Sequence, residues 1–229
     1  LAQTFGDFDF LILDDGSTDG SAEMVEAYRD PRIRLMRQAT HRGLVETLNQ
    51  GFAIAGGRFV ARMDADDRAR PQRLERQVKR MQDDDRIGVV GCGVEVIDAH
   101  GRRRPRFRLV ADSHELVCWQ LLFENCIAHS SVMVRRAAFL QVGGYRQGSW
   151  SEDYDLWVRM SRGYRVVQLP EVLQEYRLHP DSVLARDGAQ HEAWRLRVMG
   201  EQATHVLGRP VSSGALDGLR RLSRYEPLL

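Results

Sequence analysis

The sequence predicts an α/β fold in which a doubly wound, mixed sheet is flanked by helices. Two observations support this prediction: short apolar stretches alternate three times with amphipathic ones over residues 8–81, and an acidic turn follows both the first and the third apolar stretch. Alternating strands and helices form right-handed βαβ units. Ligands of such sheets bind at the carboxyl ends of the strands, which is where both acidic turns are expected.

The first half of the chain predicts three strands, each followed by a helix. Residues 8–13 form a nearly continuous apolar run, typical of a strand that is buried on both faces. In residues 43–55 the apolar side chains recur at three- and four-residue spacing, which predicts an amphipathic helix, and Pro71 fits the first turn of the next one. The other predicted elements of this half are a helix at 21–28 and strands at 33–36 and 59–63.

The second half predicts a less regular mixture of strands and helices. Glycines interrupt the apolar residues 88–97, so we expect two strands, 88–90 and 94–97, around a turn, and then a hairpin tip at 98–101. The remaining predicted elements are helices at 113–123 and 151–161, strands at 131–134, 165–169 and 172–178, and a final helix at 188–207.

Composition narrows the class of protein. The 229 residues carry 33 Lys and Arg against 32 Asp and Glu, so no overall field attracts nucleic acid. The longest uncharged run, 47–57, is too short to cross a bilayer, and we expect no transmembrane segment.

Three cysteines without CxxC spacing favour reduced thiols in the cytoplasm and argue against a zinc site. Since the first residues show neither an initiator methionine nor a signal peptide, we expect a truncated N-terminus.

Two acidic turns are candidates for ligand binding. Asp64 and Asp66 place two carboxylates at the end of a strand, where their mutual repulsion favours a shared hard divalent cation. The turn that begins with Asp14 and Asp15 contains Gly16, which lets the backbone approach a ligand, and its carboxylates can accept hydrogen bonds from a nucleoside. The alternative for each turn is a structural one, an acidic cap on the helix that follows.

Further candidates lie at the start of the predicted helix 151–161, where Glu152, Asp153 and Asp155 gather. A carboxylate there can act as a general base or can simply stabilise the helix dipole, and taken alone the dipole explanation is favoured. His179 ends a predicted strand, and His129 lies in a polar stretch before another. For both histidines a structural role is the more common one, so the residues alone assign neither.

These segments, taken together and in this order, resemble the family 2 glycosyltransferases over about residues 1–182. The resemblance implies a GT-A fold, a nucleoside diphosphate sugar donor, Mn²⁺ or Mg²⁺ as cofactor, inversion at the anomeric carbon and a place in polysaccharide biosynthesis. The segments that carry it are 14–21 (DDGSTDGS), 41–51 (HRGLVETLNQG), 59–67 (FVARMDADD), 152–157 (EDYDLW) and 176–179 (YRLH).

The resemblance also assigns roles to single residues. It implies that the donor or the acceptor contacts Asp14, Asp15, Asp64 and Glu152; that the metal is held by Asp66 and His179; and that the catalytic base is Asp153. Two features depart from the family pattern. The usual N-terminal strand with a Pro-x-Tyr-Asn-like segment is absent, in line with the expected truncation, and His41 stands where many members have Asn.

The resemblance further implies a nucleotide-sugar-binding half at 1–90, incomplete at its N-terminus, an acceptor and catalytic half of the same domain at 91–187, and a C-terminal helical extension at 188–229. The acceptor is expected to be a glycan, a lipid-linked sugar or a small molecule, and the location cytoplasmic, with contact to the inner face of a membrane left open. The arginines of 102–108 would meet an acidic acceptor or membrane, or form a solvated loop. A nucleotidyltransferase on a related fold and an inactive sugar-nucleotide-binding module remain alternatives.

Overall fold

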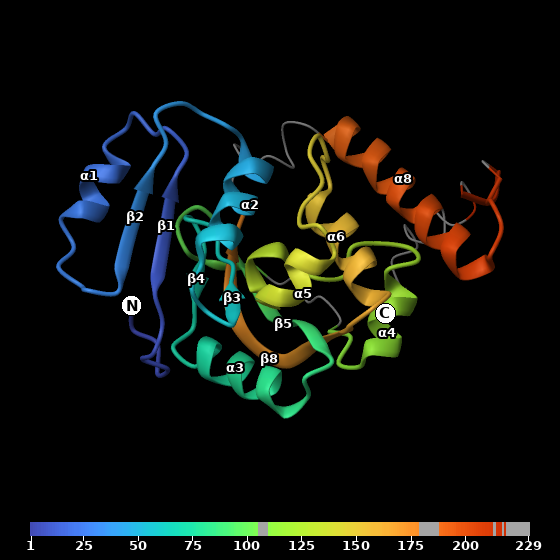
Figure 1. Cartoon of the computed structure of the whole chain (residues 1–229), viewed down its shortest axis with the longest axis horizontal. Helices are drawn as coiled ribbons and strands as arrows, with labels where there is room; N and C mark the ends of the chain where they lie inside the picture. Colours follow the sequence, from blue (N-terminus) through green and yellow to red (C-terminus); the bar gives the residue numbers. More distant parts are fainter. Residues whose placement is uncertain (105–109, 179–187, 213, 217, 219–229) are drawn as a thin grey trace.

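The computed structural model describes residues 1–104, 110–178, 188–212, 214–216 and 218, and its strands form two sheets. A two-stranded sheet with α1 (Ser21–Glu26) forms one end of the molecule, a six-stranded sheet lies in the middle, and α8 (Gly188–Leu207) forms the other end (Figure 1). The predicted α/β class, a mixed sheet flanked by helices, is confirmed.

The smaller sheet is the predicted first βαβ unit. Strands β1 (Phe10–Asp14) and β2 (Ile33–Arg37) run parallel, with Asp14 opposite Arg37 at their carboxyl ends. The next helix, α2 (Leu44–Ile54), lies close against β1, because a Cβ atom on Gly51 would come within 2.6 Å of Leu13 Cδ1. The first acidic turn therefore lies at the strand end where it was expected.

The larger sheet has the strand order β3-β7-β5-β8-β4, and β6 is added to β5. The strands are β3 (Phe59–Ala61), β4 (Arg68–Ala69), β5 (Ile87–Ile97), β6 (Arg103–Arg104), β7 (Met133–Arg135) and β8 (Arg165–Arg177). Within this sheet β5 and β8 are parallel, and the other described pairings are antiparallel. The expectation that the third strand continues the parallel βαβ series is wrong, since β3 pairs with β7 from the second half of the chain.

Two expected breaks in this sheet are also wrong, because β5 and β8 are each one continuous strand. The glycines of β5 serve close packing between strands: a Cβ atom on Gly93 would lie only 2.8 Å from the carbonyl oxygen of Glu171. Register shifts around Gly93 accommodate this approach within the ladder. An isolated glycine in an apolar run can thus mark a close strand contact and not a turn.

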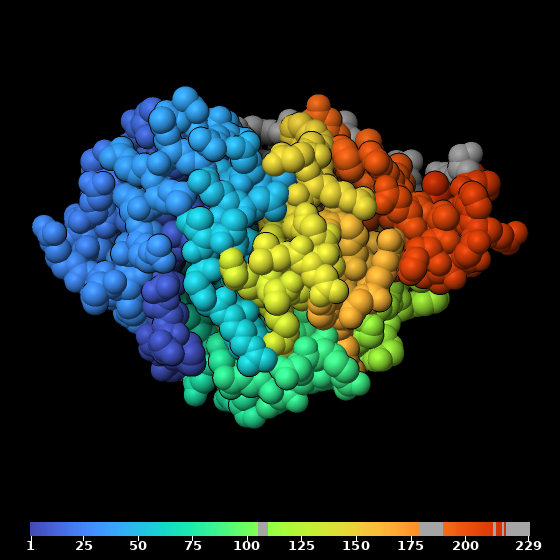
Figure 2. Space-filling view, viewed as in Figure 1, coloured from blue at the N-terminus to red at the C-terminus, as the bar shows by residue number. Residues whose placement is uncertain are grey.

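The helices beside the larger sheet belong to two hydrophobic clusters: side chains of α2, α4, α5, α6 and α8 form the larger one, and Met81 of α3 belongs to a smaller one. The helices not yet given are α3 (Arg73–Asp83), α4 (His114–Gln120), α5 (Arg136–Gln141) and α6 (Glu152–Ser161), of which only α5 was not expected. The α6 side chain of Trp157 is fully buried, and the ring of Phe52 from α2 stacks on Phe139 from α5 with centroids 3.7 Å apart. In the space-filling view, α2 and α5 meet on one face of the molecule (Figure 2). Of the helices that the structure describes, none combines the length and apolar character needed to cross a bilayer.

A buried arginine on α3 connects this helix to the strands beside the second acidic turn. Arg73 is 1% exposed, and its guanidinium donates to Gln77 Oε1 (3.1 Å), Gln174 Oε1 (2.8 Å) and the carbonyl oxygens of Arg62 (2.7 Å) and Val132 (3.1 Å). Burial lowers the pKa of Arg73 to about 10, so the group stays charged at neutral pH. These bonds fix the end of β3 and the residue before β7 relative to α3.

We predict that Arg73→Met unfolds at lower denaturant concentration, with a loss of at least about 3 kcal/mol in the free energy of unfolding, because three of the four buried acceptors lose their donor and only the Val132 carbonyl keeps one, the Arg62 backbone N–H. Urea unfolding followed by tryptophan fluorescence measures it. The matched control is Arg76→Met, the same change at an exposed position of α3, which should cost less than about 0.5 kcal/mol. Equal losses would contradict the structural role of Arg73.

Candidate active site

The second acidic turn begins directly after β3 with an ion pair. Both carboxylate oxygens of Asp64 face the guanidinium of Arg62, whose side chain is 7% exposed while that of Asp64 is 35% exposed. A two-pronged contact of this kind fixes the carboxylate in orientation as well as in position. Asp64 is therefore partly exposed at the site, and its negative charge is paired with Arg62.

The other end of the same turn is tied to the end of β8. Asp67 is buried, and its carboxylate accepts from the Arg177 backbone N–H at 2.8 Å and from Gln174 Nε2 at 3.3 Å. Arg177 in turn donates through Nε to the carbonyl oxygen of Asp66 at 2.7 Å. The structure thus brings the DxD turn against residues 174–178. His179, the expected second metal ligand, lies outside the described residues.

Asp153 and Glu152 open α6 and lie side by side in the site. Asn125 Nδ2 donates to Asp153 Oδ2 at 2.7 Å, and the Tyr154 backbone N–H donates to Asp153 Oδ1 at 2.7 Å. Glu152 Oε1 lies 3.4 Å from Nδ1 of His129, and only about a tenth of each of these two side chains is exposed. Burial raises the pKa of both carboxyl groups. A carboxylate with a raised pKa takes up a proton more readily, which suits a general base.

His129 and Arg62 complete this cluster, and neither was assigned by the sequence. His129 Nε2 lies 2.8 Å from the Tyr145 hydroxyl, and burial together with the positive charge of Arg62 lowers the pKa of His129 to about 3. The imidazole is therefore neutral at physiological pH. The positive charge of Arg62 partly offsets the rise in the pKa of Glu152, so Arg62 acts on both the DxD turn and the start of α6. Arg62 lies two residues before its partner Asp64, but nothing in the sequence showed that the two side chains pair, and the partners of His129 come from other elements.

The third carboxylate of α6, Asp155, has a structural role. It is buried and pairs with Arg146 at 3.0 Å and with Arg159 at 2.8 Å. Arg159 also donates to the carbonyl oxygens of Val142 (2.7 Å) and Gly144 (2.6 Å). Asp155 therefore holds the loop that leads from α5 to α6, and with it Tyr145.

The first acidic turn contains a separate concave surface. Asp14 accepts from the Ser17 backbone N–H at 2.9 Å, and the hydrogen bonds of Ser17 lower the pKa of Asp14. Asp15 accepts from the backbone N–H groups of Arg42 (2.8 Å) and Gly43 (2.9 Å). It therefore fixes the two residues that precede α2. A cavity of about 450 Å³ opens between β1 and β2, lined by Asp14, Gly16, Ser17, Thr18, Arg37, Gln38 and Ala39.

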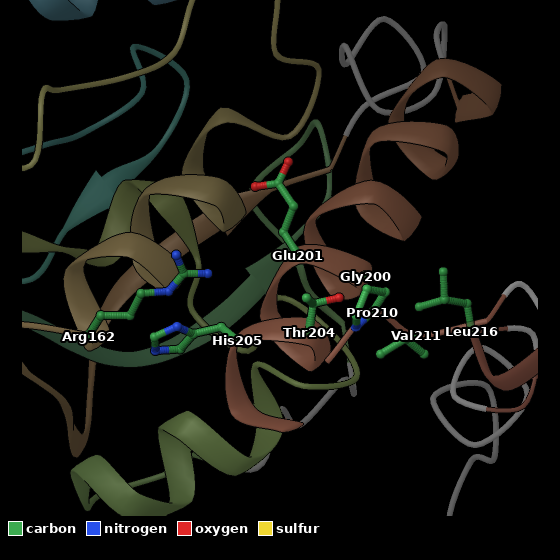
Figure 3. Close-up of a pocket in the computed structure, with 8 residues that line it drawn as sticks. All are labelled: Arg162, Gly200, Glu201, Thr204, His205, Pro210, Val211 and Leu216. Atoms are coloured by element: carbon green, nitrogen blue, oxygen red, sulfur yellow. The ribbon is translucent and has the colours of Figure 1, made fainter. Parts of the chain in front are cut away.

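A larger cavity lies away from all of these residues. It has a volume of about 530 Å³ and opens between the end of α6 and α8, as the side chains in Figure 3 show. Its lining consists of Arg162, Gly200, Glu201, Thr204, His205, Pro210, Val211 and Leu216. None of the side chains assigned from the sequence contributes to it, so size alone does not identify the functional site.

The charged loop after β5 is partly described. Arg103 pairs with Glu95 at 3.2 Å and Arg104 with Asp98 at 3.5 Å, both at exposed arginines, which is the arrangement of a solvated charged surface. Arg106 and Arg108 lie outside the described residues. The expected contact with an acidic acceptor or membrane therefore stays a prediction.

The donor set of the DxD turn fits a hard divalent cation. Among the residues that the structure describes, no three His, Cys, Asp or Glu side chains are grouped closely enough to hold a metal by themselves. Mg²⁺-type ions are nevertheless usually bound by one or two carboxylates together with substrate phosphates and water. Asp66 would supply such a carboxylate, since both oxygens of Asp64 already face Arg62, and the ion would bind together with a diphosphate.

Comparison with known proteins identifies a family that the chain matches. Residues 1–143 match the model of the family described as glycosyl transferase family 2. The chain is 32% identical over 187 residues to the O-antigen biosynthesis glycosyltransferase WbnJ of Escherichia coli, covering 80% of this chain and 72% of WbnJ. It is 31% identical over 172 residues to the amylovoran biosynthesis glycosyltransferase AmsE of Erwinia amylovora, covering 72% of this chain and 64% of AmsE.

Among solved structures, the mannosyltransferase PcManGT from Pyrobaculum calidifontis, in complex with GDP-Man and Mn²⁺, matches with a TM-score of 0.60. The match covers 98% of this chain and 62% of PcManGT at 20% sequence identity, so it shows a shared fold alone. The chain spans about two thirds of the length of these three proteins.

The depressed pKa of His129 predicts a pH dependence of stability. Between pH 6.5 and about 3 the unfolded chain binds a proton at His129 that the folded chain does not, so the free energy of unfolding falls as the pH is lowered. This contribution has a slope of up to about 1.4 kcal/mol per pH unit. Urea unfolding at pH 7, 6 and 5 should show a shallower slope for His129→Gln than for the parent chain. Identical slopes would show that His129 is not buried in neutral form.

Proposed function

Because the chain belongs to the family 2 glycosyltransferases, we propose that it moves a sugar from a nucleoside diphosphate sugar to an acceptor hydroxyl with inversion at the anomeric carbon. The observation that carries the proposal is the arrangement at the start of α6. A carboxylate with a raised pKa, Asp153, is held by Asn125 beside a second carboxylate and next to the DxD turn. One base on one face of the sugar suffices for a single displacement.

In the proposed reaction the acceptor oxygen forms a bond to the anomeric carbon while the bond from that carbon to the diphosphate oxygen breaks. Asp153 takes the proton of the attacking hydroxyl at its carboxylate. Glu152, next to it, would accept a hydrogen bond from the acceptor and orient it. The proton later passes from Asp153 to solvent, so the carboxylate is restored for the next turnover.

The leaving diphosphate gains negative charge as the bond breaks, and positive charge near it lowers the barrier. A divalent metal, held by Asp66 and His179, would supply that charge as a Lewis acid. Arg62, paired with Asp64 at the same turn, would add positive charge on this side of the site. For the nucleoside we propose the cavity beside Asp14, with Asp15 ordering the turn that forms its wall.

The class of acceptor follows from the relatives. Since WbnJ and AmsE are named for O-antigen and amylovoran biosynthesis, we propose a glycan or lipid-linked sugar as the acceptor and polysaccharide biosynthesis at the cytoplasmic side of a membrane as the setting. Mn²⁺ or Mg²⁺ is the proposed cofactor, supported by the Mn²⁺ in PcManGT.

The alternatives find less support. A nucleotidyltransferase needs a Gly-rich, basic phosphate loop after its first strand, whereas β1 is followed by the acidic segment 14–21. An inactive binding module has no use for a buried carboxylate pair with raised pKa values, since burial of such groups costs stability. Hydrolysis of nucleotide sugars, or its absence, separates an enzyme from a binding module.

We predict that Asp153→Asn lowers the rate of sugar transfer about 10²- to 10⁴-fold and leaves donor affinity nearly unchanged, because the amide keeps the shape of the carboxylate but cannot accept the proton. Turnover of nucleotide sugars and calorimetric donor binding measure the two effects. Asp83→Asn makes the same chemical change near the end of α3, where the carboxylate is exposed, and should keep full turnover. If donor binding falls as much as turnover in Asp153→Asn, Asp153 is a donor contact and not the base.

We predict that Asp66→Ala abolishes the enhancement of nucleoside diphosphate binding by Mn²⁺, because the ion loses a carboxylate ligand and the diphosphate loses its counter-charge. Calorimetric titration of GDP and UDP with and without Mn²⁺ measures this enhancement. Asp19→Ala, a carboxylate of the first acidic turn, should keep it. The metal assignment is wrong if Mn²⁺ tightens binding equally in Asp66→Ala and in the parent chain.

A further inference from the structure

One short segment supplies a polar side chain to each of the two carboxylates that begin α6. Asn125 donates to Asp153 at 2.7 Å, and His129, four residues later, approaches Glu152 with Nδ1 at 3.4 Å. Catalytic contacts are commonly longer in the absence of substrate and shorten when it binds. The segment 125–129 thus places a different group beside each carboxylate: the amide of Asn125 beside Asp153 and the imidazole of His129 beside Glu152.

The second nitrogen of His129 is held by a rigid partner. Nε2 lies 2.8 Å from the hydroxyl of Tyr145, and the backbone of Tyr145 is fixed by Asn49, which exchanges two hydrogen bonds of 2.9 Å with it. The adjacent Gly144 has φ +66°, and a Cβ atom there would lie 2.7 Å from Asn49 Oδ1, so the close approach of α2 requires glycine. The rings of His129 and Trp157 also meet in a T-shaped arrangement, with centroids 5.9 Å apart.

The protonation of this chain of groups follows from burial. The imidazole of His129 is neutral, so it has one N–H donor and one acceptor nitrogen. Burial raises the pKa of the Tyr145 phenol, which therefore keeps its proton. The arrangement that satisfies both ends has the Tyr145 hydroxyl donating to Nε2 and the N–H of Nδ1 directed at Glu152.

We propose that His129 is a positioning residue for sugar transfer: held at Nε2 by Tyr145, it orients Glu152 through Nδ1, so that Glu152 aligns the acceptor hydroxyl for attack while Asp153 takes its proton. The proposal rests on the proposed function and adds the group that sets the geometry of its acceptor side. Misplacement of a reacting group by about 1 Å can cost about 10²-fold in rate. The contact between His129 and Glu152 is the part that matters for turnover, and the contact with Tyr145 only supports it.

Two conservative variants separate the two ends of the imidazole. The amide nitrogen of Asn overlays Nδ1 of histidine, and that of Gln overlays Nε2. His129→Asn should therefore keep the contact with Glu152 and lower kcat by no more than about 3-fold, whereas His129→Gln should lower kcat about 10- to 100-fold, both with an unchanged KM for the donor. Tyr145→Phe removes only the hydroxyl and should behave like His129→Asn. The measurement is hydrolysis of UDP-glucose, UDP-N-acetylglucosamine and GDP-mannose, with water as acceptor.

A double-mutant cycle with Glu152→Gln shows whether His129 acts through Glu152. In the Glu152→Gln background, His129→Gln should lower kcat by less than about 3-fold, because its target is already gone. Equal losses for His129→Asn and His129→Gln, or losses that multiply independently with Glu152→Gln, would overturn the positioning role while leaving the glycosyltransferase intact. A parent chain that hydrolyses none of the three donors overturns the proposed function and this inference with it.

Discussion

The arrangement of the candidate active site depends on the burial of one guanidinium group, that of Arg73. A charge removed from water is tolerated only where hydrogen-bond acceptors surround it. Arg73 finds them in two side-chain amides and in the carbonyl oxygens of Arg62 and Val132. Because these carbonyls belong to the end of β3 and to the residue before β7, the strand that leads into the DxD turn cannot shift without breaking a hydrogen bond to the buried charge.

This constraint extends outward through glutamines and carboxylates. Gln77 donates to the carbonyl oxygens of Val90 and Ser131. Gln174 accepts a hydrogen bond from Arg73 and donates one to Asp67, so it links the two side chains. Asp67 then fixes the backbone at Arg177. The acidic turn is therefore fixed at two places: α3 binds the residue after β3 through Arg73, and the end of β8 binds Asp67. A turn fixed in this way can present two carboxylates at one edge without rearranging when a ligand binds.

At the start of α6, burial determines the charge state of the acidic side chains. Glu152 and Asp153 are poorly hydrated, so their pKa values rise, and the neutral imidazole of His129 adds no compensating charge. Arg62, which is paired with Asp64, partly offsets the rise in the pKa of Glu152. The result is a pair of carboxylates that are stable in the fold and inclined to take up a proton, which is the property that a general base requires.

The family resemblance to glycosyltransferases could be recognised from the sequence because its motifs are short and contiguous. Segments such as 59–67 and 152–157 carry their acidic residues in fixed order, and the family match over residues 1–143 includes the first of them. The same locality explains why most helices and the strands of the first βαβ unit were predicted, since hydrophobic period is a property of neighbouring residues. The roles assigned to Asp15, Asp66 and Asp153 came from the resemblance and stay predictions.

Only the tertiary structure decided which residues stand beside those motifs. Asn125 meets Asp153 and His129 meets Tyr145 across 28 and 16 residues of chain, and Arg73 reaches Gln174 across 101. Likewise, the glycines of β5 predicted a turn, whereas the approach of β8 makes them a close strand contact. By itself the sequence determined the elements and the acidic motifs, because these depend on spacing along the chain. The partners that orient and charge those motifs depend on packing between distant segments, which no local pattern records.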